Sequence, residues 1–428
     1  MKISRFNTFT PYKGNIVIYN SLWDSCMMTS PDNIIHSILK AKDNEKLSLL
    51  DEKALTYLLK NKFVISSSVN ELDVVKSQLD TTNDSSDYYI LTINPTLSCN
   101  FRCWYCYENH SGKKNMSRND ISSIIKLVET ILCQPSIKYI HLNFFGGEPL
   151  LCFSSVVKPL IEAAKSIADL NKKKYFVSLT TNAFYLKEDY AKFFKKHNLY
   201  SYQITLDGNR VRHNQVRTDS NGTKSYDIIV HNIKYALSLN SNVIVRLNLS
   251  DETNLDVPLL LNDFQDLPPT EKSHLMFSVQ KIWQASDSVN DTIKEVIDMI
   301  RRSGYNCQKF DISFRNIKNT CYSDKKHHII INPNGEIYGC TARDFNEKTL
   351  EGKLCADGII QYSDIRHKRM NTSPLSNSEC RECKILPMCI GGCKQKLMEN
   401  NDGKHCPYGF SESDKTKLAE YYVSERFI

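Results

Sequence analysis

The regular alternation of strand and helix patterns through the middle of the chain is the strongest constraint on its fold. Short apolar runs typical of strands stand at Tyr89–Ile93, Tyr139–Phe145, Tyr175–Thr181, Tyr202–Leu206, Val243–Leu249 and Leu275–Val279. Helical patterns separate them, and the one at Ser117–Leu132 begins with a capping-box pair, Ser117 and Asp120. Because strands that alternate with helices become parallel, we expect an α/β fold with a partial (β/α)6 barrel similar to a TIM barrel.

Composition divides the chain into three segments, 1–85, 86–304 and 305–428. The first is predicted to be a small α+β module, followed by a polar linker at Thr81–Asp87. Its expected elements are extended pieces at Ile3–Phe9, Asn15–Tyr19 and Phe63–Ile65 and helices at Asn33–Lys40 and Asp51–Lys60. Asp51 is the expected N-cap of the second helix. The last segment lacks apolar periodicity until a helix near Ser411–Glu425, so we expect bound metal to organise it.

Cysteine is unusually frequent, with 15 cysteines in 428 residues and nine of them within 305–428. The first 20 residues lack the features of a secretory signal, and no run of about 18 apolar residues predicts a membrane span. We therefore expect a cytoplasmic protein, in which cysteine clusters more often bind metal than form disulfides. The net charge of +7 is spread along the chain, which argues against nucleic acid or a membrane as a partner.

Cys99, Cys103 and Cys106 form a Cys-x3-Cys-x2-Cys pattern directly after the first strand of the expected barrel. Three thiolates on one short loop can hold three irons of a 4Fe–4S cluster and leave the fourth iron open to another ligand. A zinc knuckle is the alternative interpretation, but zinc usually takes Cys-x2-Cys pairs with a fourth protein ligand. In barrels of this kind the loops after the strands carry the chemistry, which favours the iron–sulfur interpretation.

The surrounding sequence, LTINPTLSCNFRCWYCYENH, resembles the signature loop of the radical S-adenosylmethionine (SAM) enzymes. The resemblance implies that the three cysteines ligate a 4Fe–4S cluster and that the amino and carboxylate groups of SAM chelate the open iron. Tyr105 would then lie beside the adenine. Gly146, Gly147, Glu148 and Pro149 match the GGEP motif of that family, in which the glycines let the backbone approach the ammonium group of SAM and the glutamate accepts from it or organises the loop.

Later motifs agree with this family in type and order. Thr181 and Asn182 resemble its Thr-Asn-Gly end of the third strand, with Ala183 in place of glycine. In ITLDGNRVRHNQVR, Arg217 aligns with an arginine that pairs with the carboxylate of SAM. Arg246 and Asn248 follow the pattern of the fifth strand. No residue is assigned as general acid or base, because His213 alone is more typical of a structural histidine.

The C-terminal cysteines resemble the SPASM domain, which carries two auxiliary 4Fe–4S clusters in enzymes that modify peptides and proteins. By that resemblance the distal cluster is bound by Cys380, Cys383, Cys389 and Cys406. The proximal cluster is bound by Cys321, Cys340 and Cys393. A zinc ribbon is the alternative for this segment alone. It explains neither the seven-cysteine order nor the upstream motifs.

The fourth proximal ligand is unassigned because YSDKKHH follows Cys321, where some relatives place another cysteine. The candidates are His327, His328, Cys355 and Cys307. An open iron that binds a substrate thiolate is a further hypothesis. The remaining cysteines, Cys26, Cys133 and Cys152, are predicted to be small buried hydrophobic residues.

The first segment resembles in outline the leader-recognition domains fused to radical SAM enzymes that mature ribosomally made peptides. A peptide could add as a strand at an exposed sheet edge. The alternative is a cap that only packs on the barrel. The match is one of topology and rests on no motif.

The combined resemblance implies a radical SAM peptide maturase with three 4Fe–4S clusters. Such an enzyme reductively cleaves SAM to a 5′-deoxyadenosyl radical and oxidises or crosslinks a precursor peptide by a thioether or C–C bond, with flavodoxin or ferredoxin as electron donor. One alternative is an anaerobic sulfatase-maturing enzyme that makes formylglycine. Relatives of that kind carry an Asp immediately after the cysteine that matches Cys340, whereas this chain has Thr341. The other alternative is a non-catalytic iron–sulfur protein that binds peptide or relays electrons.

Overall fold

The computed structural model describes residues 1–108, 115–219, 221–250, 257–286, 289–308, 316–399 and 403–427. The chain forms two compact units. The central unit contains Ser86–Asp311 and His327–His367, and the terminal unit combines Met1–Ser85, Ile312–Lys326 and Lys368–Ile428. This grouping differs from the three consecutive segments expected from the sequence, because the last segment is divided between the two units.

The central unit is built on one large, mostly parallel sheet. Six strands follow the expected runs: β6 (Tyr88–Ile93), β7 (Tyr139–Phe144), β8 (Lys174–Thr181), β9 (Leu199–Leu206), β10 (Val243–Leu249) and β11 (Leu275–Lys281). Each pairs in parallel with the next, which confirms the predicted strands and their direction. Beyond β11 the short β12 (Asn306–Cys307) continues the parallel order.

The other edge of this sheet is built from the third predicted segment. β13 (His328–Ile331) pairs in parallel with β6, and its four residues are all buried. The antiparallel strands β14 (Glu336–Tyr338), β15 (Leu350–Leu354) and β16 (Ile360–Tyr362) follow. Segment 327–367 therefore belongs to the central sheet, because its isoleucine-rich run offers a strand that is buried on both faces.

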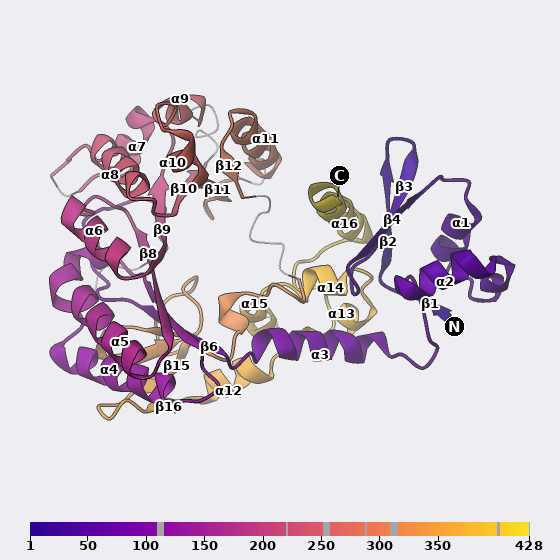
Figure 1. The fold of residues 1–428 in the computed structure, drawn as a ribbon, viewed down its shortest axis with the longest axis horizontal. Coiled ribbons are helices and arrows are strands. Elements are labelled where there is room, and N and C mark those ends of the chain that lie inside the picture. Colours follow the sequence, from indigo (N-terminus) through magenta and orange to yellow (C-terminus); the bar gives the residue numbers. More distant parts are fainter. Residues whose placement is uncertain are drawn as a thin grey trace. The chain divides into compact units, whose positions relative to one another are not determined.

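Helices run along one side of the central strands in Figure 1, from purple α4 to pink α8. They are α4 (Arg118–Leu132), α5 (Lys158–Leu170), α6 (Glu188–Lys196) and α8 (Tyr226–Ser238). The expected capping box of α4 is present, and Ile124, Val128 and Ile131 are buried in the core. Shorter or later helices complete the central unit: α7 (Arg210–Val216), α9 (Val257–Asn262), α10 (Pro269–Ser273) and α11 (Val289–Arg302). The carboxyl ends of the strands are thereby left for loops.

In the terminal unit, the N-terminal segment forms an antiparallel sheet in the order β2 (Asn7–Tyr12), β3 (Asn15–Asn20) and β4 (Ser25–Thr29). Lys13 and Gly14 close the first hairpin with φ of +44° and +78°, as the tightest two-residue turns require. β1 (Lys2–Ile3) pairs with β5 (Val64–Ile65). The expected helices are α1 (Ile34–Ala41) and α2 (Glu52–Lys60), and Asp51 caps α2 as predicted.

One expected linker is wrong. Helix α3 runs from Glu71 to Asn83 and so occupies the first part of Thr81–Asp87. Val75 and Leu79 on its buried face pack with Phe6 and Leu22 of the N-terminal strands and loops. The helix continues because this apolar face is covered, which a polar local composition does not reveal.

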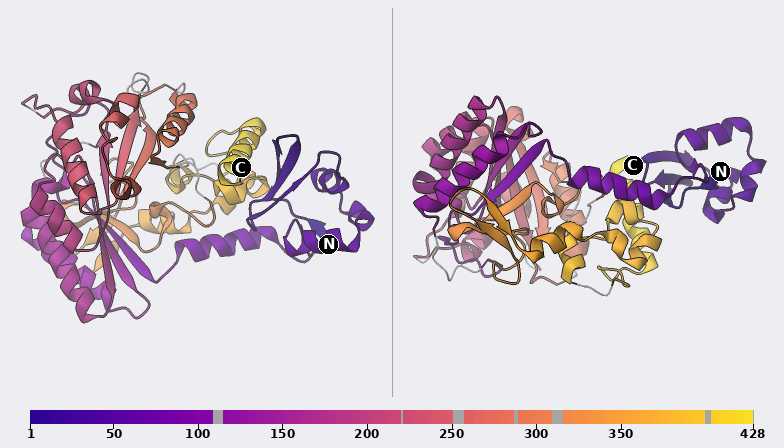
Figure 2. Two further views of the ribbon diagram at one scale, coloured as in Figure 1. Left: turned by 45° about the horizontal axis from the view of Figure 1, so that its top comes forward. Right: turned by 90° about the horizontal axis from the view of Figure 1, so that it is seen from below.

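The two ends of the chain share hydrophobic cores within the terminal unit. Its C-terminal helices are α13 (Ser378–Glu382), α14 (Leu386–Cys389), α15 (Lys394–Glu399) and α16 (Glu412–Phe427). The left view of Figure 2 shows yellow α16 beside the indigo N-terminal sheet. Tyr422 of α16 stacks on Tyr19 of β3 with ring centroids 5.7 Å apart. Among the described residues, no helix is both long and apolar enough to cross a membrane.

Candidate active site

The cysteine loop, residues 94–108, leaves the carboxyl end of β6 and carries Cys99, Cys103 and Cys106. The backbone N–H of Cys106 donates to the carbonyl of Cys103 at 3.0 Å, which closes a tight turn. The N–H of Phe101 points at Sγ of Cys99 at 3.4 Å. Cys99 and Cys103 are half-buried and pack against the core, whereas Cys106 is exposed. The structure thus places all three thiols on one loop at the end of the parallel strands.

Two glycines after β7 run directly against the start of this loop. The N–H of Gly147 donates to the carbonyl of Thr96 at 3.1 Å, and the N–H of Glu148 donates to that of Ser98 at 2.9 Å. A Cβ on Gly147 would lie 2.1 Å from the Ser98 oxygen, and one on Gly146 would lie 2.6 Å from the Thr96 oxygen. Glycine is therefore required here for contact between the two loops. An approach of these glycines to SAM stays a prediction.

Glu148 is fully buried, and its carboxylate accepts three hydrogen bonds from the protein. Oε1 accepts from the N–H of Leu150 at 3.0 Å and from the hydroxyl of Thr181 at 2.7 Å, and Oε2 accepts from the N–H of Asn182 at 2.8 Å. Burial raises the pKa of Glu148 to about 6, although these hydrogen bonds act in the opposite direction. Pro149 is buried and begins a short 3-10 helix, Pro149–Cys152, at which Glu148 is the N-cap. Glu148 therefore joins the β7 and β8 loops.

The end of β8 also contacts the cysteine loop. Asn182 donates to Oδ1 of Asn100 at 2.8 Å and lies 3.9 Å from Sγ of Cys99. The next residue, Ala183, has φ of +59°, the left-handed conformation that favours glycine and costs other residues about 1–2 kcal/mol. The glycine that the family carries at this position fits the backbone better than the alanine of this chain. Asn100 was not among the predicted site residues. Its position next to a metal-ligand candidate in the sequence could have identified it.

A buried polar network links the cysteine loop to the ends of β9 and β10. Nε of Arg217 donates to Oδ2 of Asp207 at 2.5 Å, and its Nη2 donates to the hydroxyl of Tyr105 at 2.6 Å. The Tyr105 hydroxyl donates to Asp207 at 2.6 Å and accepts from Nδ2 of Asn248 at 3.1 Å. Oδ1 of Asp207 is buried and has no hydrogen-bond partner among the described residues. This orphaned acceptor fits a bound polar ligand.

Two neighbours fix this network in place. Nε of Arg246 donates to Oδ1 of Asn248 at 2.9 Å, which orients the amide of Asn248 towards Tyr105. His213 is fully buried, and its Nδ1 faces the N–H of Asp207 at 3.3 Å while its Nε2 lies 3.1 Å from the hydroxyl of Ser225. Burial lowers the pKa of His213 to about 3, so the ring is neutral. Its contacts are those of a structural histidine. Asp207 was also not among the predicted residues, although an Asp directly after a strand was the signal.

The electrostatics of the cysteine loop oppose free thiolates. Burial raises the pKa of Cys99 to about 12, and burial also raises that of Cys103 although Arg217 nearby acts against it. Metal ligation requires the thiolate, so a bound cation must supply the stabilisation that the protein does not.

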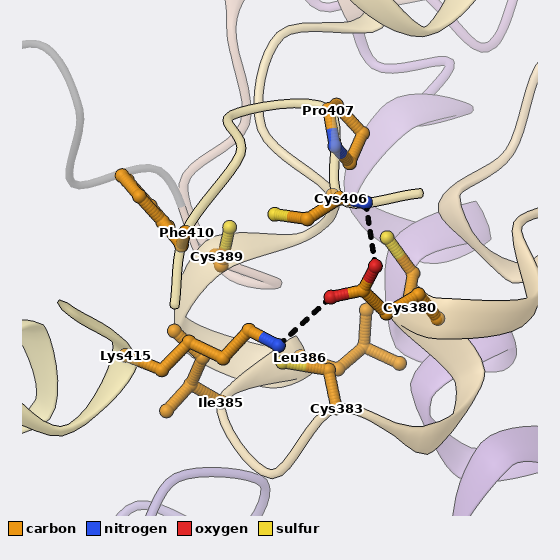
Figure 3. Close-up of a pocket in the computed structure, with 11 residues that line it drawn as sticks. Cys380, Cys383, Ile385, Leu386, Cys389, Cys406, Pro407, Phe410 and Lys415 are labelled. Carbon is orange, nitrogen blue, oxygen red and sulfur yellow. Dashed lines mark hydrogen bonds and ion pairs between the residues drawn. The ribbon is translucent and has the colours of Figure 1, made fainter. Parts of the chain in front are cut away.

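A second cysteine site lies in the terminal unit. Cys380, Cys383, Cys389 and Cys406 line one pocket (Figure 3). Burial raises the pKa of Cys389 to about 12, and the nearby sulfur atoms of Cys383, Cys380 and Cys406 add to this shift. The structure therefore brings together the four cysteines that the sequence assigned to the distal cluster. Four thiols around one pocket are the donor set of a 4Fe–4S cluster. Across the described residues no three Cys, His, Asp or Glu side chains converge closely enough for a single metal ion.

The predicted proximal ligands are divided between the units. Cys321 and Cys393 belong to the terminal unit and Cys340 to the central unit, so their assembly stays a prediction. Of the candidates for the fourth ligand, His328 is buried in β13 and its Nε2 lies 3.0 Å from the hydroxyl of Thr92. Cys307 is buried in β12, and Cys355 is half-buried. His327 packs edge-on to Tyr89.

The cysteines predicted to be buried hydrophobic residues differ in their surroundings. Cys152 is buried, as expected. Cys26 is half-buried because it lies in β4, at the edge of the N-terminal sheet. The prediction is wrong for Cys133, which is exposed because it caps the C-terminus of α4 at a surface turn.

Comparison with known proteins defines the class. The Radical SAM superfamily matches residues 93–264, which contain the cysteine loop and the strand ends around it. The chain therefore carries a radical SAM domain, and it is a radical SAM enzyme related to peptide maturases and sulfatase maturases. A radical SAM domain implies a 4Fe–4S cluster and SAM.

Two relatives and one solved structure extend over most of the chain. A cysteine-type anaerobic sulfatase-maturating enzyme of Clostridium novyi is 23% identical over 378 residues, which cover 78% of this chain and 97% of the relative. The radical SAM cyclopropyl synthase TigE of Paramaledivibacter caminithermalis is 21% identical over 416 residues, 88% of this chain and 82% of the relative. The structure of Streptococcus suis SuiB bound to precursor peptide SuiA has a TM-score of 0.54 at 17% identity, and the match covers 94% of this chain and 97% of SuiB. At that identity the likeness shows the fold alone.

Proposed function

We propose that this protein is a radical SAM peptide maturase that oxidatively modifies or crosslinks a ribosomally made peptide by a thioether or C–C bond. The observation that carries the proposal is the pocket of four cysteines in the terminal unit, which would hold a second cluster in a chain that already has a radical SAM domain. A cluster away from the SAM-binding loop suits an oxidation, because the electron removed from the substrate needs an acceptor.

The central unit has residues that fit the SAM cluster and SAM. Cys99, Cys103 and Cys106 would hold the cluster. Their loop accepts backbone hydrogen bonds from Gly147 and Glu148. When bound, this cluster and SAM supply a 5′-deoxyadenosyl radical that abstracts hydrogen. SAM would be held by predicted residues at the strand ends: Tyr105, Gly146, Gly147, Glu148, Pro149, Thr181, Asn182, Arg217, Arg246 and Asn248. The six parallel strands would form the partial barrel around it.

Two auxiliary clusters are proposed beside this one, which makes three 4Fe–4S clusters in all. Cys380, Cys383, Cys389 and Cys406 would hold the distal cluster, and their shared pocket supports this set. Cys321, Cys340 and Cys393 would hold the proximal cluster, whose fourth iron is a candidate for a substrate thiolate. Flavodoxin or ferredoxin would be the electron donor.

The substrate is proposed to be a precursor peptide. SuiB was solved with a precursor peptide, and the Clostridium relative is a sulfatase-maturating enzyme. In this chain β4 is an edge strand of the N-terminal sheet, and its Met28 is exposed. A leader peptide could pair along β4, since an open sheet edge offers unpaired backbone groups.

The decisive experiment is anaerobic reconstitution with the small peptide encoded beside the gene, followed by mass spectrometry. We expect loss of hydrogen from the peptide together with a new crosslink or modification. Conversion of a sulfatase-derived Cys or Ser peptide to an aldehyde would support the sulfatase-maturing alternative, which the Clostridium relative favours and Thr341 disfavours. Absence of 5′-deoxyadenosine under reducing conditions would support a non-catalytic protein.

The role of β4 is tested by a point change, because Phe6 and Leu22 share a core with Cys380 and deletion of the N-terminal segment would disturb the cysteine pocket. Met28→Lys places a charge on the open edge and should weaken binding of the leader peptide without reducing SAM cleavage. Leu49→Lys is the matched control, since Leu49 is also exposed in the terminal unit but lies outside the sheet. If both variants bind the leader peptide equally well, the N-terminal segment is better interpreted as a cap that only packs on the barrel.

A further inference from the structure

Helix α16 places one lysine against the cysteine pocket. Lys415, Ala419, Tyr422 and Val423 are spaced so that they share one helix face. Ala419, Tyr422 and Val423 are buried in a core with Tyr19 of the N-terminal sheet. One turn earlier on the same face, Lys415 lines the pocket of the four cysteines (Figure 3). The contacts of α16 with the sheet therefore fix where this lysine lies.

Lys415 is only 6% exposed, which is unusual because most lysines extend their ammonium group into water. Its Nζ donates to Oε1 of Glu379 at 3.0 Å and to Oε1 of Glu412 at 2.9 Å. Burial acts against the charge, but the hydrogen bonds to Glu412 and Glu379 outweigh it and raise the pKa of Lys415. Two carboxylates within hydrogen-bond distance favour the charged ammonium form.

Glu379 connects this lysine to the cysteines themselves. Its Oε2 accepts from the backbone N–H of Cys406 at 2.7 Å, and Glu379 also lines the pocket. Glu412 differs, since its side chain is 72% exposed and does not line the pocket. The wall of the pocket thus carries one buried positive charge and one partly buried negative charge, and water screens the third group.

We propose that Lys415 sets the reduction potential of the cluster held by Cys380, Cys383, Cys389 and Cys406, with Glu379 as the opposing charge. The inference rests on the proposed function, which assigns a cluster to this pocket. Reduction adds one electron, and therefore one negative charge, to the cluster. A fixed cation at the wall stabilises the reduced state and raises the potential, whereas a carboxylate lowers it. Lys415 is a positioning residue in this sense and not a ligand.

The test is an anaerobic redox titration of the full-length protein, monitored by electron paramagnetic resonance. The signal of this pocket is identified as the one that Cys383→Ser removes. Lys415→Met should lower its midpoint potential and Glu379→Gln should raise it, while Lys415→Arg should leave it nearly unchanged. Glu412→Gln should raise it by less than Glu379→Gln. Lys417→Met is the matched control, because Lys417 lies on the same helix but is exposed, and it should cause no shift.

Opposite shifts from Lys415→Met and Glu379→Gln distinguish charge from general disturbance, since a distorted pocket would move both potentials in one direction. If Lys415→Met loses the cluster, the two glutamate variants still test the sign. Shifts in one direction, or none, would overturn the inference. Iron content separates this from failure of the proposed function: if Cys383→Ser and Cys389→Ser bind as much iron as the parent protein, no cluster occupies the pocket.

Discussion

The two cysteine sites of this protein are supported in different ways. The cysteine loop of the central unit packs Cys99 and Cys103 against the core and is also tied by polar contacts: backbone hydrogen bonds from Gly147 and Glu148, and the bond between Asn182 and Asn100. The cysteine pocket of the terminal unit is held largely by apolar contacts. Cys380 packs with Phe6 and Leu22, and Cys383 and Cys389 pack against the core that contains Tyr19 and Tyr422.

This difference indicates two relations between metal and fold. A loop fixed by hydrogen bonds to neighbouring strand ends keeps its shape without a cluster. A pocket whose cysteines are part of the hydrophobic core loses packing when its thiols are no longer held together. We therefore expect metal loss to disable the first site chemically and to loosen the second site structurally.

Exchanging one cysteine in each site gives the largest expected contrast. Cys103→Ser should reduce 5′-deoxyadenosine formation to background, because the SAM cluster loses a ligand. Hydrogen exchange in α16 and the N-terminal sheet should stay unchanged. Cys389→Ser should retain SAM cleavage but increase exchange in both elements.

Cys133→Ser is the control for this pair, since Cys133 is exposed and belongs to neither site. Loss of SAM cleavage in Cys389→Ser to the level of Cys103→Ser would show that the two sites do not act separately. Unchanged exchange in α16 would show that the pocket does not depend on its metal.

Gly147→Ala tests how closely the cysteine loop depends on its polar support. A Cβ would lie 2.1 Å from the carbonyl of Ser98, so the backbone just before Cys99 must move. A displacement of about 1 Å in catalytic geometry can cost roughly 100-fold in rate, and we expect a loss of that order in SAM cleavage. Gly222→Ala is the control, because its Cβ meets nothing within 4 Å and its φ of +72° adds a backbone penalty that Gly147 does not carry. If both variants cleave SAM at similar rates, the close contact with Gly147 does not hold the cysteine loop in its active geometry.

Glu148→Gln should destabilise the central unit by about 1–3 kcal/mol, because an amide N–H₂ would face at least one of the three donors that the carboxylate now satisfies. Urea denaturation measures this. Glu188→Gln is the control, since Glu188 forms only an exposed pair with Lys192 and should change stability by about 0.3–0.5 kcal/mol. An effect of Glu148→Gln no larger than the control would mean that the buried carboxylate does not hold the strand ends together.

The sequence predicted the parts of these sites that are local. The six strands follow apolar periodicity, and the cysteine triad and the run Cys380 to Cys393 are defined by short spacings. Each is fixed by neighbours along the chain, so a pattern reveals it. Asp51 as a helix cap and the capping box of Ser117 were predicted for the same reason.

The parts that the sequence did not reveal depend on contacts between distant segments. Lys415 meets Glu379 across 36 residues, and Asp207 meets Tyr105 across 102 residues. The grouping of both chain ends in the terminal unit also depends on distant contacts. Phe6 packs with Cys380, and no local sequence pattern predicts that packing. Helix α3 was missed because its stability comes from that packing.

Acid should weaken the two units in a defined order. In the central unit, burial lowers the pKa of His213 from 6.5 to about 3. The neutral ring therefore contributes stability that is complete above pH 6.5 and is lost as the pH falls from there towards 3, by up to about 1.4 kcal/mol per pH unit. In the terminal unit, the hydrogen bond from Lys415 holds the pKa of Glu379 below 4.5, so its contribution is lost only below that pH. Protonation of Glu148, whose pKa burial raises to about 6, acts in the opposite direction between pH 6 and 4.5, whereas His141, whose pKa burial lowers to about 4, adds to the loss. Between pH 6.5 and 4.5 the two histidines outweigh the one carboxylate, and the central unit should weaken first.

Pulse proteolysis in urea, with the cut sites identified by mass spectrometry, can follow both units in one sample. From pH 7 to pH 5 we expect the urea midpoint of the central unit to fall while that of the terminal unit changes little. His213→Gln removes one titrating ring and should reduce the pH dependence of the central unit, even if acid also releases iron from both sites, while His141 would still contribute. The N–H of Asp207 faces Nδ1 of His213, so a protonated ring would present a second donor to it and disturb the network of Tyr105 and Arg217. Equal decline of both units in the parent protein and in His213→Gln would place the acid sensitivity elsewhere and remove this difference between the two sites.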